Sequence, residues 1–162
     1  MKKLIAVCGS DGDDEGLKQH AMDVAEEVGS LIASKGSILL CGGKGGVMEA
    51  AARGAKKSGG ITVGILPIEK SEANEFIDVP LPTKLGSARN FLIINSADAV
   101  IGICGRWGTM SEISFSMNIG KKTIVIKGTG GFADVLSSAT NLPNGKPLVA
   151  KNAKEAVEMA MK

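Results

Sequence analysis

Three short apolar runs in this chain end in the same dipeptide, and a helical pattern follows each of them. The runs lead into Cys8-Gly9, Cys41-Gly42 and Cys104-Gly105. Short apolar strands that alternate with helices build parallel sheets covered on both faces, and their crossovers are right-handed. The pattern predicts an α/β fold, namely a doubly wound, mainly parallel Rossmann-like sheet with helices on both faces.

The other elements follow the same alternation along one domain, residues 1–162. Further strands are predicted at 61–66, 123–126 and 148–149, with a short extended piece at 76–79. Helices are predicted at about 17–35, 47–57, 85–96, 109–119, 132–136 and 152–161. Gly36 is expected to end the first helix, and Asp13 or Asp14 to cap its start. Asn152 and Glu155 have the spacing of a cap pair.

Composition excludes several classes of function. The net charge of the 162-residue chain is only +2, and its lysines do not gather with aromatic residues, so we expect no nucleic-acid binding. No apolar run reaches about 18 residues, so we expect no membrane span and a cytoplasmic protein. Three cysteines without CxxC spacing and a single histidine, His20, argue against a metal site or a disulfide framework. The cysteines are interpreted as small buried hydrophobes.

The glycine turns at the strand ends predict a ligand site. In an open parallel sheet, ligands bind outside the carboxyl ends of the strands, where the winding direction switches, and helix N-termini at that edge attract anions such as phosphate. If the strand order is Rossmann-like, the strands that begin at Leu4 and Ala99 flank this switch point. A fourth glycine-rich turn, KGTGG (127–131), follows the strand predicted at 123–126. Any one glycine-rich turn also serves tight packing, but four on one edge favour a ligand crevice. Trp107 either stacks on a base or packs over its turn. The candidate ligand-binding residues are Gly9, Ser10, Gly42, Gly43, Lys44, Gly46, Gly105, Arg106, Trp107, Gly108 and Thr109.

Three motifs resemble those of the LONELY GUY phosphoribohydrolases, a family long described as lysine decarboxylases. The stretch CGGKGGVM (41–48) resembles their Gly-Gly-Gly-x-x-Gly-x-Met element, and CGRWGTMSE (104–112) resembles Pro-Gly-Gly-x-Gly-Thr-x-x-Glu. GSARN (86–90) lies where the family has an Arg-Lys pair. The resemblance covers about residues 4–126. The superfamily also contains molybdenum-cofactor carrier proteins, and the short chain with GGVMEA and ARN is closer to that carrier-like branch.

The resemblance implies two functions. The first is hydrolysis of the N-glycosidic bond of a nucleoside 5′-monophosphate, with no organic cofactor and with Arg89 and Glu112 as the catalytic pair. The alternative is a non-catalytic carrier or sensor of a phosphate-bearing pterin or nucleotide. The resemblance further implies a homodimer or homotetramer, for which the helix at 109–119 is a candidate surface. Lysine decarboxylase chemistry has no support, because no pyridoxal-site pattern is present. A dinucleotide-dependent oxidoreductase is disfavoured, because the first turn lacks G-x-G-x-x-G.

The chain departs from the family pattern at three positions. Cys104 stands at the motif's proline, Arg106 at its second glycine, and Asn90 at the lysine after the active-site arginine. These changes weaken the prediction of hydrolysis more than the prediction of a phosphate site. Glu112 itself has a structural alternative, because Thr109 and Glu112 have capping-box spacing.

Overall fold

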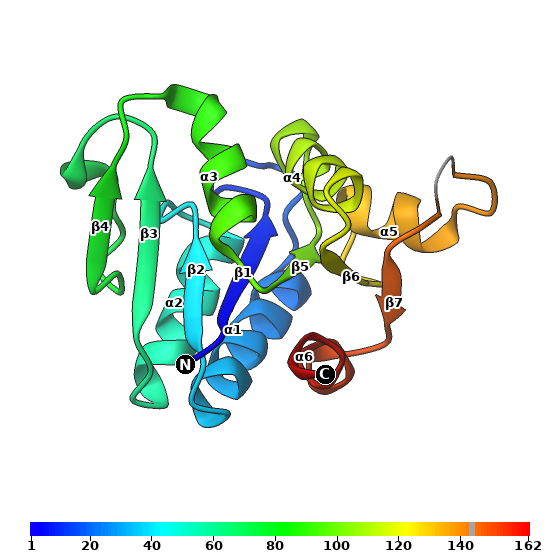
Figure 1. Cartoon of the computed structure of the whole chain (residues 1–162), viewed down its shortest axis with the longest axis horizontal. Coiled ribbons are helices and arrows are strands. Elements are labelled where there is room, and N and C mark those ends of the chain that lie inside the picture. Colours follow the sequence, from blue (N-terminus) through cyan, green and yellow to red (C-terminus); the bar gives the residue numbers. More distant parts are fainter. Residues whose placement is uncertain (143–144) are drawn as a thin grey trace.

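Seven parallel strands form one sheet in the order β4-β3-β2-β1-β5-β6-β7 (Figure 1). The computed structural model describes residues 1–142 and 145–162. The winding direction switches beside β1, which pairs with both β2 and β5, so the predicted α/β fold and its switch point are confirmed. The strands are β1 (Leu4–Gly9), β2 (Ile38–Cys41), β3 (Thr62–Leu66), β4 (Val79–Pro82), β5 (Ala99–Ile103), β6 (Lys122–Ile126) and β7 (Leu148–Ala150).

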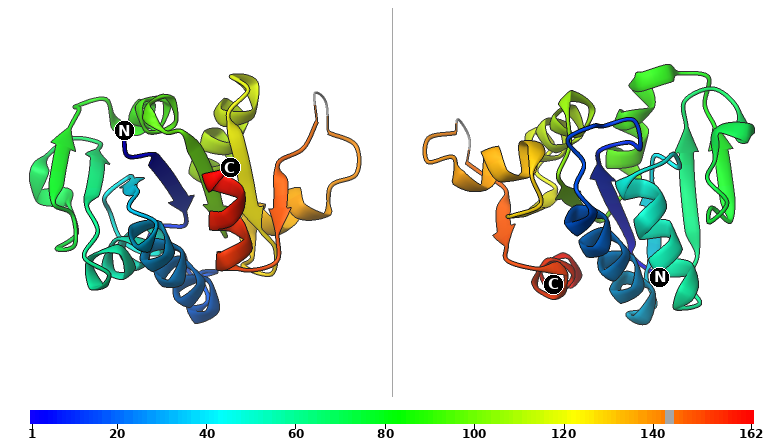
Figure 2. Two further views of the ribbon diagram at one scale, coloured as in Figure 1. Left: turned by 60° about the horizontal axis from the view of Figure 1, so that its bottom comes forward. Right: turned by 180° about the vertical axis from the view of Figure 1, so that it is seen from behind.

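Helices cover both faces of the sheet (Figure 2). One face carries α1 (Gln19–Ser34), α2 (Val47–Lys57) and α6 (Ala153–Met161), and the other carries α3 (Arg89–Ser96), α4 (Trp107–Asn118) and α5 (Gly131–Ser138). Two short 3₁₀ turns, η1 (Lys70–Glu72) and η2 (Gly86–Ala88), lie on either side of β4 in the chain. Within the described residues, no helix is both long and apolar enough to cross a membrane.

The core consists of small and branched aliphatic side chains in two layers. Along β5, Ile101 packs toward α1, α2 and α6, whereas Val100 packs toward α3, α4 and α5, as alternation along a strand requires. Gly29 of α1 and Gly54 of α2 lie against backbone of the facing helix, where a Cβ atom has no room. Close approach of these two helices compensates for the scarcity of large aromatic residues in the chain.

Two of the three helix ends predicted from the sequence are confirmed, and one is wrong. Gly36 follows α1 with φ +72°, the left-handed conformation expected of a helix-ending glycine. Asn152 Oδ1 accepts from the Glu155 N–H (2.9 Å), although the Glu155 carboxylate binds the N–H of Lys151 and not that of the cap itself. The predicted cap by Asp13 or Asp14 is wrong. Helix α1 begins only at Gln19 without a side-chain cap, because the preceding residues form turns of their own.

Two predicted boundaries shift on either side of the edge strand. The extended piece predicted at 76–79 becomes a strand at 79–82, whose prolines are tolerated because β4 lies at the edge of the sheet. The helix predicted from residue 85 begins as the 3₁₀ turn η2, and regular α-helix starts at Arg89. Gly86 has φ +55°, a left-handed conformation that prevents a continuous helix there.

Candidate functional site: a charged cavity at the carboxyl edge of the sheet

A cavity of about 410 Å³ lies at the switch point, where β1 ends and α3 and α4 begin. Three basic and three acidic side chains share its wall, so it is strongly polar without one dominant charge. The lining residues are Gly9, Ser10, Asp11, Asp13, Lys44, Met48, Pro67, Gly86, Ser87, Arg89, Asn90, Arg106, Gly108, Thr109 and Glu112.

The turn after β5 presents the N-terminus of α4 to this cavity. Cys104 (φ +55°) and Gly105 (φ +102°) bend the chain, and α4 starts at Trp107 without a side-chain cap. The first intrahelical bond runs from the Met110 N–H to the Arg106 carbonyl (3.0 Å), so the N–H groups before it need other partners. Gly108 and Thr109 belong to this first turn and line the cavity. The arrangement is physically suited to an anion.

The capping box considered as the structural alternative for Thr109 and Glu112 does not form. The position before α4 is occupied by Arg106, so Thr109 is already the third helical residue and Glu112 lies in the second turn. The Thr109 side chain instead covers Gly105, where a Cβ atom would come within 2.5 Å of the threonine Cβ. Glu112 is therefore left without the structural role that its spacing suggested.

Arg89 is the first residue of α3, and its side chain contacts the glycine loop after β2. Arg89 is only 9% exposed, and its Nη1 donates to the carbonyls of Gly42 (3.0 Å) and Ile65 (2.6 Å). A Cβ atom at Gly42 would collide with Arg89 Nη1, so a larger residue there would displace the guanidinium. Nε is buried and has no partner among the described residues. Arg89 therefore links the ends of β2 and β3 through hydrogen bonds at the base of the cavity.

Glu112 reaches the same cavity from α4 and is 8% exposed. Within the described residues its carboxyl group makes no hydrogen bond and no ion pair. Burial raises the pKa of Glu112 to about 8, and the positive charge of Arg89 only partly opposes that rise. Burial in turn lowers the pKa of Arg89, and Glu112 counteracts this effect. A buried carboxyl group without a partner is typical of a functional site.

The acidic loop after β1 supplies ion-pair partners for two basic side chains of the site, which was not predicted from the sequence. Asp11 pairs with Lys44 (2.7 Å), and Asp13 pairs with Arg106. Both basic side chains of the loops that flank the cavity are thus already held by carboxylates. The cue was present in the sequence, because the stretch SDGDDEG directly follows a strand that ends at this edge.

Asn90 also joins the site, in the place of the family's lysine. Its Nδ2 donates to the Gly108 carbonyl (3.5 Å) and to Ser111 Oγ (3.3 Å), so it ties α3 to the start of α4. Proline, the family residue at position 104, does not fit here, because its ring fixes φ near −65° whereas Cys104 has φ +55°. The departures from the family motif therefore come with a different local backbone and a different inter-helix contact.

The structure separates the sequence candidates into two groups. The cavity wall contains Gly9, Ser10, Lys44, Arg89, Arg106, Gly108, Thr109 and Glu112, and it does not contain Gly42, Gly43, Gly46, Gly105 or Trp107. Gly46, with φ +61°, packs against the Ser10 carbonyl and leaves no room for a Cβ atom. Such glycines shape the loops, which is the packing role that competed with ligand binding. Trp107 lies across the turn, with its ring 4.7 Å from that of Phe132.

The three cysteines are all buried and free, as predicted. Burial raises the pKa of the Cys8 thiol well above its ordinary value and that of Cys41 to about 11, so both are protonated near neutral pH. Protonated, inaccessible thiols are poor nucleophiles and poor metal ligands.

The strand order and the charged cavity at the switch point define a Rossmann-like α/β domain. The chain belongs to the SLOG cluster4 family, which residues 2–157 match. An uncharacterized protein from Archaeoglobus fulgidus is 45% identical over 123 residues, 76% of this chain and 79% of that protein.

Two solved structures are similar over almost the whole chain. The molybdenum cofactor binding protein from the phototrophic bacterium Rippkaea orientalis is 32% identical with a TM-score of 0.87, covering 99% of this chain and 96% of that one. The molybdenum cofactor carrier protein from Chlamydomonas reinhardtii is 31% identical with a TM-score of 0.84, covering 99% and 97%. The predicted resemblance to the carrier-like branch is confirmed.

Proposed function

We propose that this protein binds a small phosphorylated ligand at the carboxyl edge of its sheet and carries a phosphate-bearing pterin of the molybdenum-cofactor type. The observation that carries the proposal is the uncapped N-terminus of α4, whose Gly108 and Thr109 face the cavity beside Arg106. Backbone N–H groups at a helix N-terminus bind phosphate without base or sugar specificity. Ser10, which holds the Gly105 N–H through its Oγ (3.1 Å), keeps the turn in this conformation.

Arg89 and Glu112 contact the uncharged part of the ligand. The Arg89 Nη1 is used by two carbonyls, but its Nε lacks a partner among the described residues. Glu112 offers both carboxyl oxygens, and a largely protonated acid at neutral pH both donates and accepts. Such a pair suits hydroxyl groups, whether of a ribose or of the segment that joins a pterin ring to its phosphate. These contacts bind and orient the ligand, and carriage requires no bond to break.

The carrier function is favoured over hydrolysis by the two structural relatives that bind or carry the molybdenum cofactor. The three departures from the hydrolase motif point the same way. Arg106 and Asn90 line the cavity, Cys104 bends the turn before α4, and each has a contact or backbone conformation of its own.

Copurification tests the carrier function. The protein is purified from cells that make the molybdenum cofactor, and the sample is assayed for molybdenum by elemental analysis and for pterin by fluorescence after oxidation. We expect both near one equivalent per chain, and a Gly108→Asp variant, which puts a carboxylate beside the N-terminus of α4, to lose both. A wild-type sample without molybdenum and pterin, together with no thermal stabilisation by added phosphorylated pterin, would contradict the proposal.

Hydrolysis of a nucleoside 5′-monophosphate is the second candidate, favoured by the buried Glu112 beside Arg89. In that reaction water adds to C1′ of the ribose, the C1′–N bond breaks, and the base leaves with a proton. A carboxylate can stabilise the oxocarbenium-like sugar or take the proton from water. Incubation with AMP, GMP, CMP and UMP, followed by chromatography, detects free base. Release that disappears in Glu112→Gln supports this candidate, and intact nucleotides after hours exclude it for these substrates.

Assembly and location stay predictions. We keep the homodimer or homotetramer as a proposal, because the outer side of α4 exposes Phe115, which meets the exposed Phe91 of α3 edge to face (5.5 Å between ring centroids). Sedimentation velocity of wild type and Phe115→Glu would test it. The cytoplasmic location and the lack of nucleic-acid binding likewise await measurement.

A further inference from the structure

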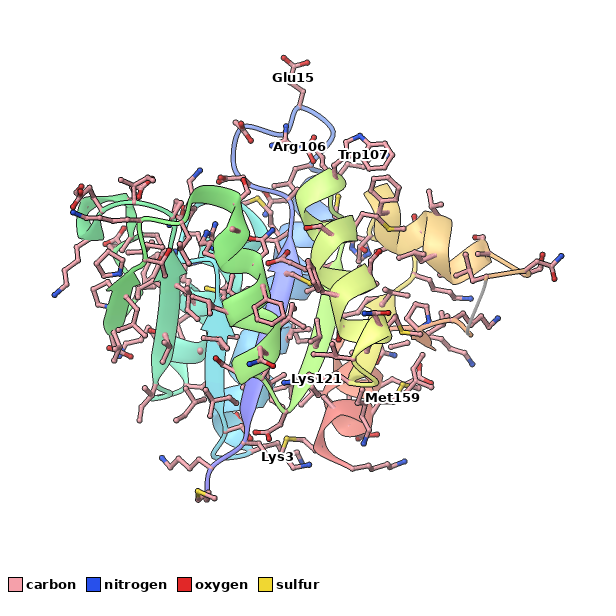
Figure 3. All side chains as sticks on the ribbon, turned by 45° about the horizontal axis from the view of Figure 1, so that its top comes forward. Lys3, Glu15, Arg106, Trp107, Lys121 and Met159 are labelled. Atoms are coloured by element: carbon pink, nitrogen blue, oxygen red, sulfur yellow. The ribbon has the colours of Figure 1, made fainter. Side chains whose placement is uncertain are left out.

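A second cavity, of about 320 Å³, lies on the other side of the turn that joins β5 to α4. Arg106 borders both cavities, so the two adjoin at this side chain. Figure 3 shows Arg106 beneath the loop that carries Glu15, and Trp107 beside it at the outer end of α4. The lining residues are Gly105, Arg106, Trp107, Gly131, Phe132 and Val135.

An aromatic platform forms the wall of this second cavity. Trp107, the only tryptophan of the chain, is 78% exposed. Its ring plane makes an angle of 59° with that of Phe132. Val135, one turn further along α5, is 60% exposed. Single exposed apolar residues need no explanation, but an indole, a phenyl ring and an isopropyl group that share one cavity form an apolar binding surface.

The platform is fixed relative to the turn. The N–H of Phe132 donates to the Gly105 carbonyl (2.9 Å), and the N–H of Ala133 donates to the Cys104 carbonyl (3.0 Å). Gly131 packs so closely on Gly105 that a Cβ atom would collide with its backbone. The start of α5 is therefore bound to the turn that presents the phosphate site, and ligand binding requires no rearrangement to form the platform.

The charged cavity offers no such surface. None of its lining residues in the described part of the chain is aromatic, and six of them are charged. A planar heteroaromatic ring gains from stacking on an aromatic face and from a guanidinium nearby. The charged cavity thus suits the phosphate and the polar groups of a ligand, whereas the ring finds its stacking partner only across Arg106.

We propose that the second cavity is the ring subsite of the ligand, where a planar bicyclic heteroaromatic ring stacks on Trp107 between Arg106 and Val135 while the phosphate lies at the N-terminus of α4. This inference rests on the proposed function. It identifies Trp107 as the residue that selects ligands with a ring over simple sugar phosphates, and it assigns a use to an exposed indole that the core does not need.

The single tryptophan makes the inference directly measurable. The wild-type protein is titrated with GMP, with neopterin monophosphate and with ribose 5-phosphate, and binding is followed by calorimetry. Tryptophan fluorescence is followed in parallel with GMP and ribose 5-phosphate. We expect GMP to quench the fluorescence with the same Kd as the calorimetric one. Ribose 5-phosphate should bind about tenfold or more weakly and leave the emission unchanged, because it lacks the ring.

Variants separate stacking from folding. Trp107→Leu should weaken both ring-bearing ligands about tenfold by calorimetry and leave ribose 5-phosphate unaffected, and Trp107→Phe should restore part of the loss. Phe115→Leu, an exposed aromatic on another side of α4, is the matched control and should change none of these affinities. Since Trp107 is largely exposed, its variants should keep the melting temperature of the wild type.

The outcomes distinguish the inference from the function on which it rests. If Trp107→Leu binds GMP and neopterin monophosphate with the Kd of the wild type, the ring subsite is overturned and the phosphate site is not. The same conclusion follows if GMP binds to the wild type without quenching its tryptophan fluorescence. No heat with any of the three ligands overturns the phosphate site, and the ring subsite with it.

Discussion

Glu112 and Arg89 reach one cavity from neighbouring helices, each more than nine-tenths buried, and no ion pair joins them in the described chain. The Arg89 Nη1 is turned to the carbonyls of Gly42 and Ile65, so its charge acts on Glu112 through space only. That attraction is weaker than the effect of burial, and the carboxyl group stays protonated to an unusually high pH.

Glu112→Gln should remove a pH dependence of stability. The pKa of Glu112 is raised from 4.5 to about 8 in the folded protein, so between these values the folded chain keeps a proton that the unfolded chain releases. Wild-type stability should therefore fall as the pH rises through this window and lose nothing more to Glu112 above about 8. Calorimetric melting from pH 4.5 to 9 should show the stability of Glu112→Gln rising relative to that of the wild type up to about pH 8, and no further change above it. An unchanging difference would contradict the raised pKa, and the exposed Glu158→Gln serves as control.

Arg89→Lys should destabilise the fold, unlike a substitution on an exposed helix. Arginine satisfies two buried carbonyls with one nitrogen, and the shorter, differently shaped lysine head leaves at least one of them unpaired. A buried acceptor without a partner costs about 1–3 kcal/mol. Urea unfolding measures the loss. Arg53→Lys, in a partly exposed pair with Glu26, is the control and should cost much less. Equal losses in the two variants would mean that the carbonyl contacts contribute nothing.

Asp13→Asn should tighten the binding of phosphate ligands. Asp13 holds Arg106 at the mouth of the cavity, so an arriving phosphate has to compete with this carboxylate. Since exposed ion pairs are worth about 0–1 kcal/mol, we expect an affinity gain of up to about fivefold at low salt, shrinking as salt rises. Glu15→Gln makes the same charge change in the same loop, where Glu15 points away from the protein (Figure 3), and should change affinity less. If the two variants gained the same affinity, the effect would come from net charge and not from the ion pair between Asp13 and Arg106.

Gly108→Ala should raise stability and lower affinity together. Gly108 is the second residue of α4, and an added Cβ atom would have no atom within 4 Å, so alanine fits and favours the helix by up to about 1 kcal/mol. The same methyl group projects into the space beside the helix N-terminus, where a phosphate would approach. Thermal melting and calorimetric titration with ribose 5-phosphate test both halves. Ser114→Ala, on the exposed side of the helix, should leave the affinity alone. Unchanged affinity in Gly108→Ala would move the phosphate elsewhere.

The sequence alone was sufficient for the fold class, because local patterns determine it. Apolar strands that end in glycine turns, each followed by a helix, allow few arrangements other than a parallel sheet, and the switch between β1 and β5 followed from that order. Gly36 and Asn152 could be assigned for the same reason, since each acts on residues only a few positions away. A prediction from local spacing failed where a residue far along the chain supplied a partner. Asp13 was predicted to cap α1, but it pairs with Arg106.

Only the tertiary structure decided what each residue of the carboxyl edge does. Arg89 and Glu112 owe their burial and altered pKa values to residues far apart in the chain, and no spacing rule reports the desolvation of a side chain. Some of the glycines line the cavity, and others only allow two loops to pack closely against each other. The sequence does not distinguish these roles, because they depend on which backbone lies opposite each glycine. Trp107 faces α5 rather than the charged cavity for a similar reason: its direction is set by the contact between two helix starts that the sequence places 24 residues apart, at Trp107 and Gly131.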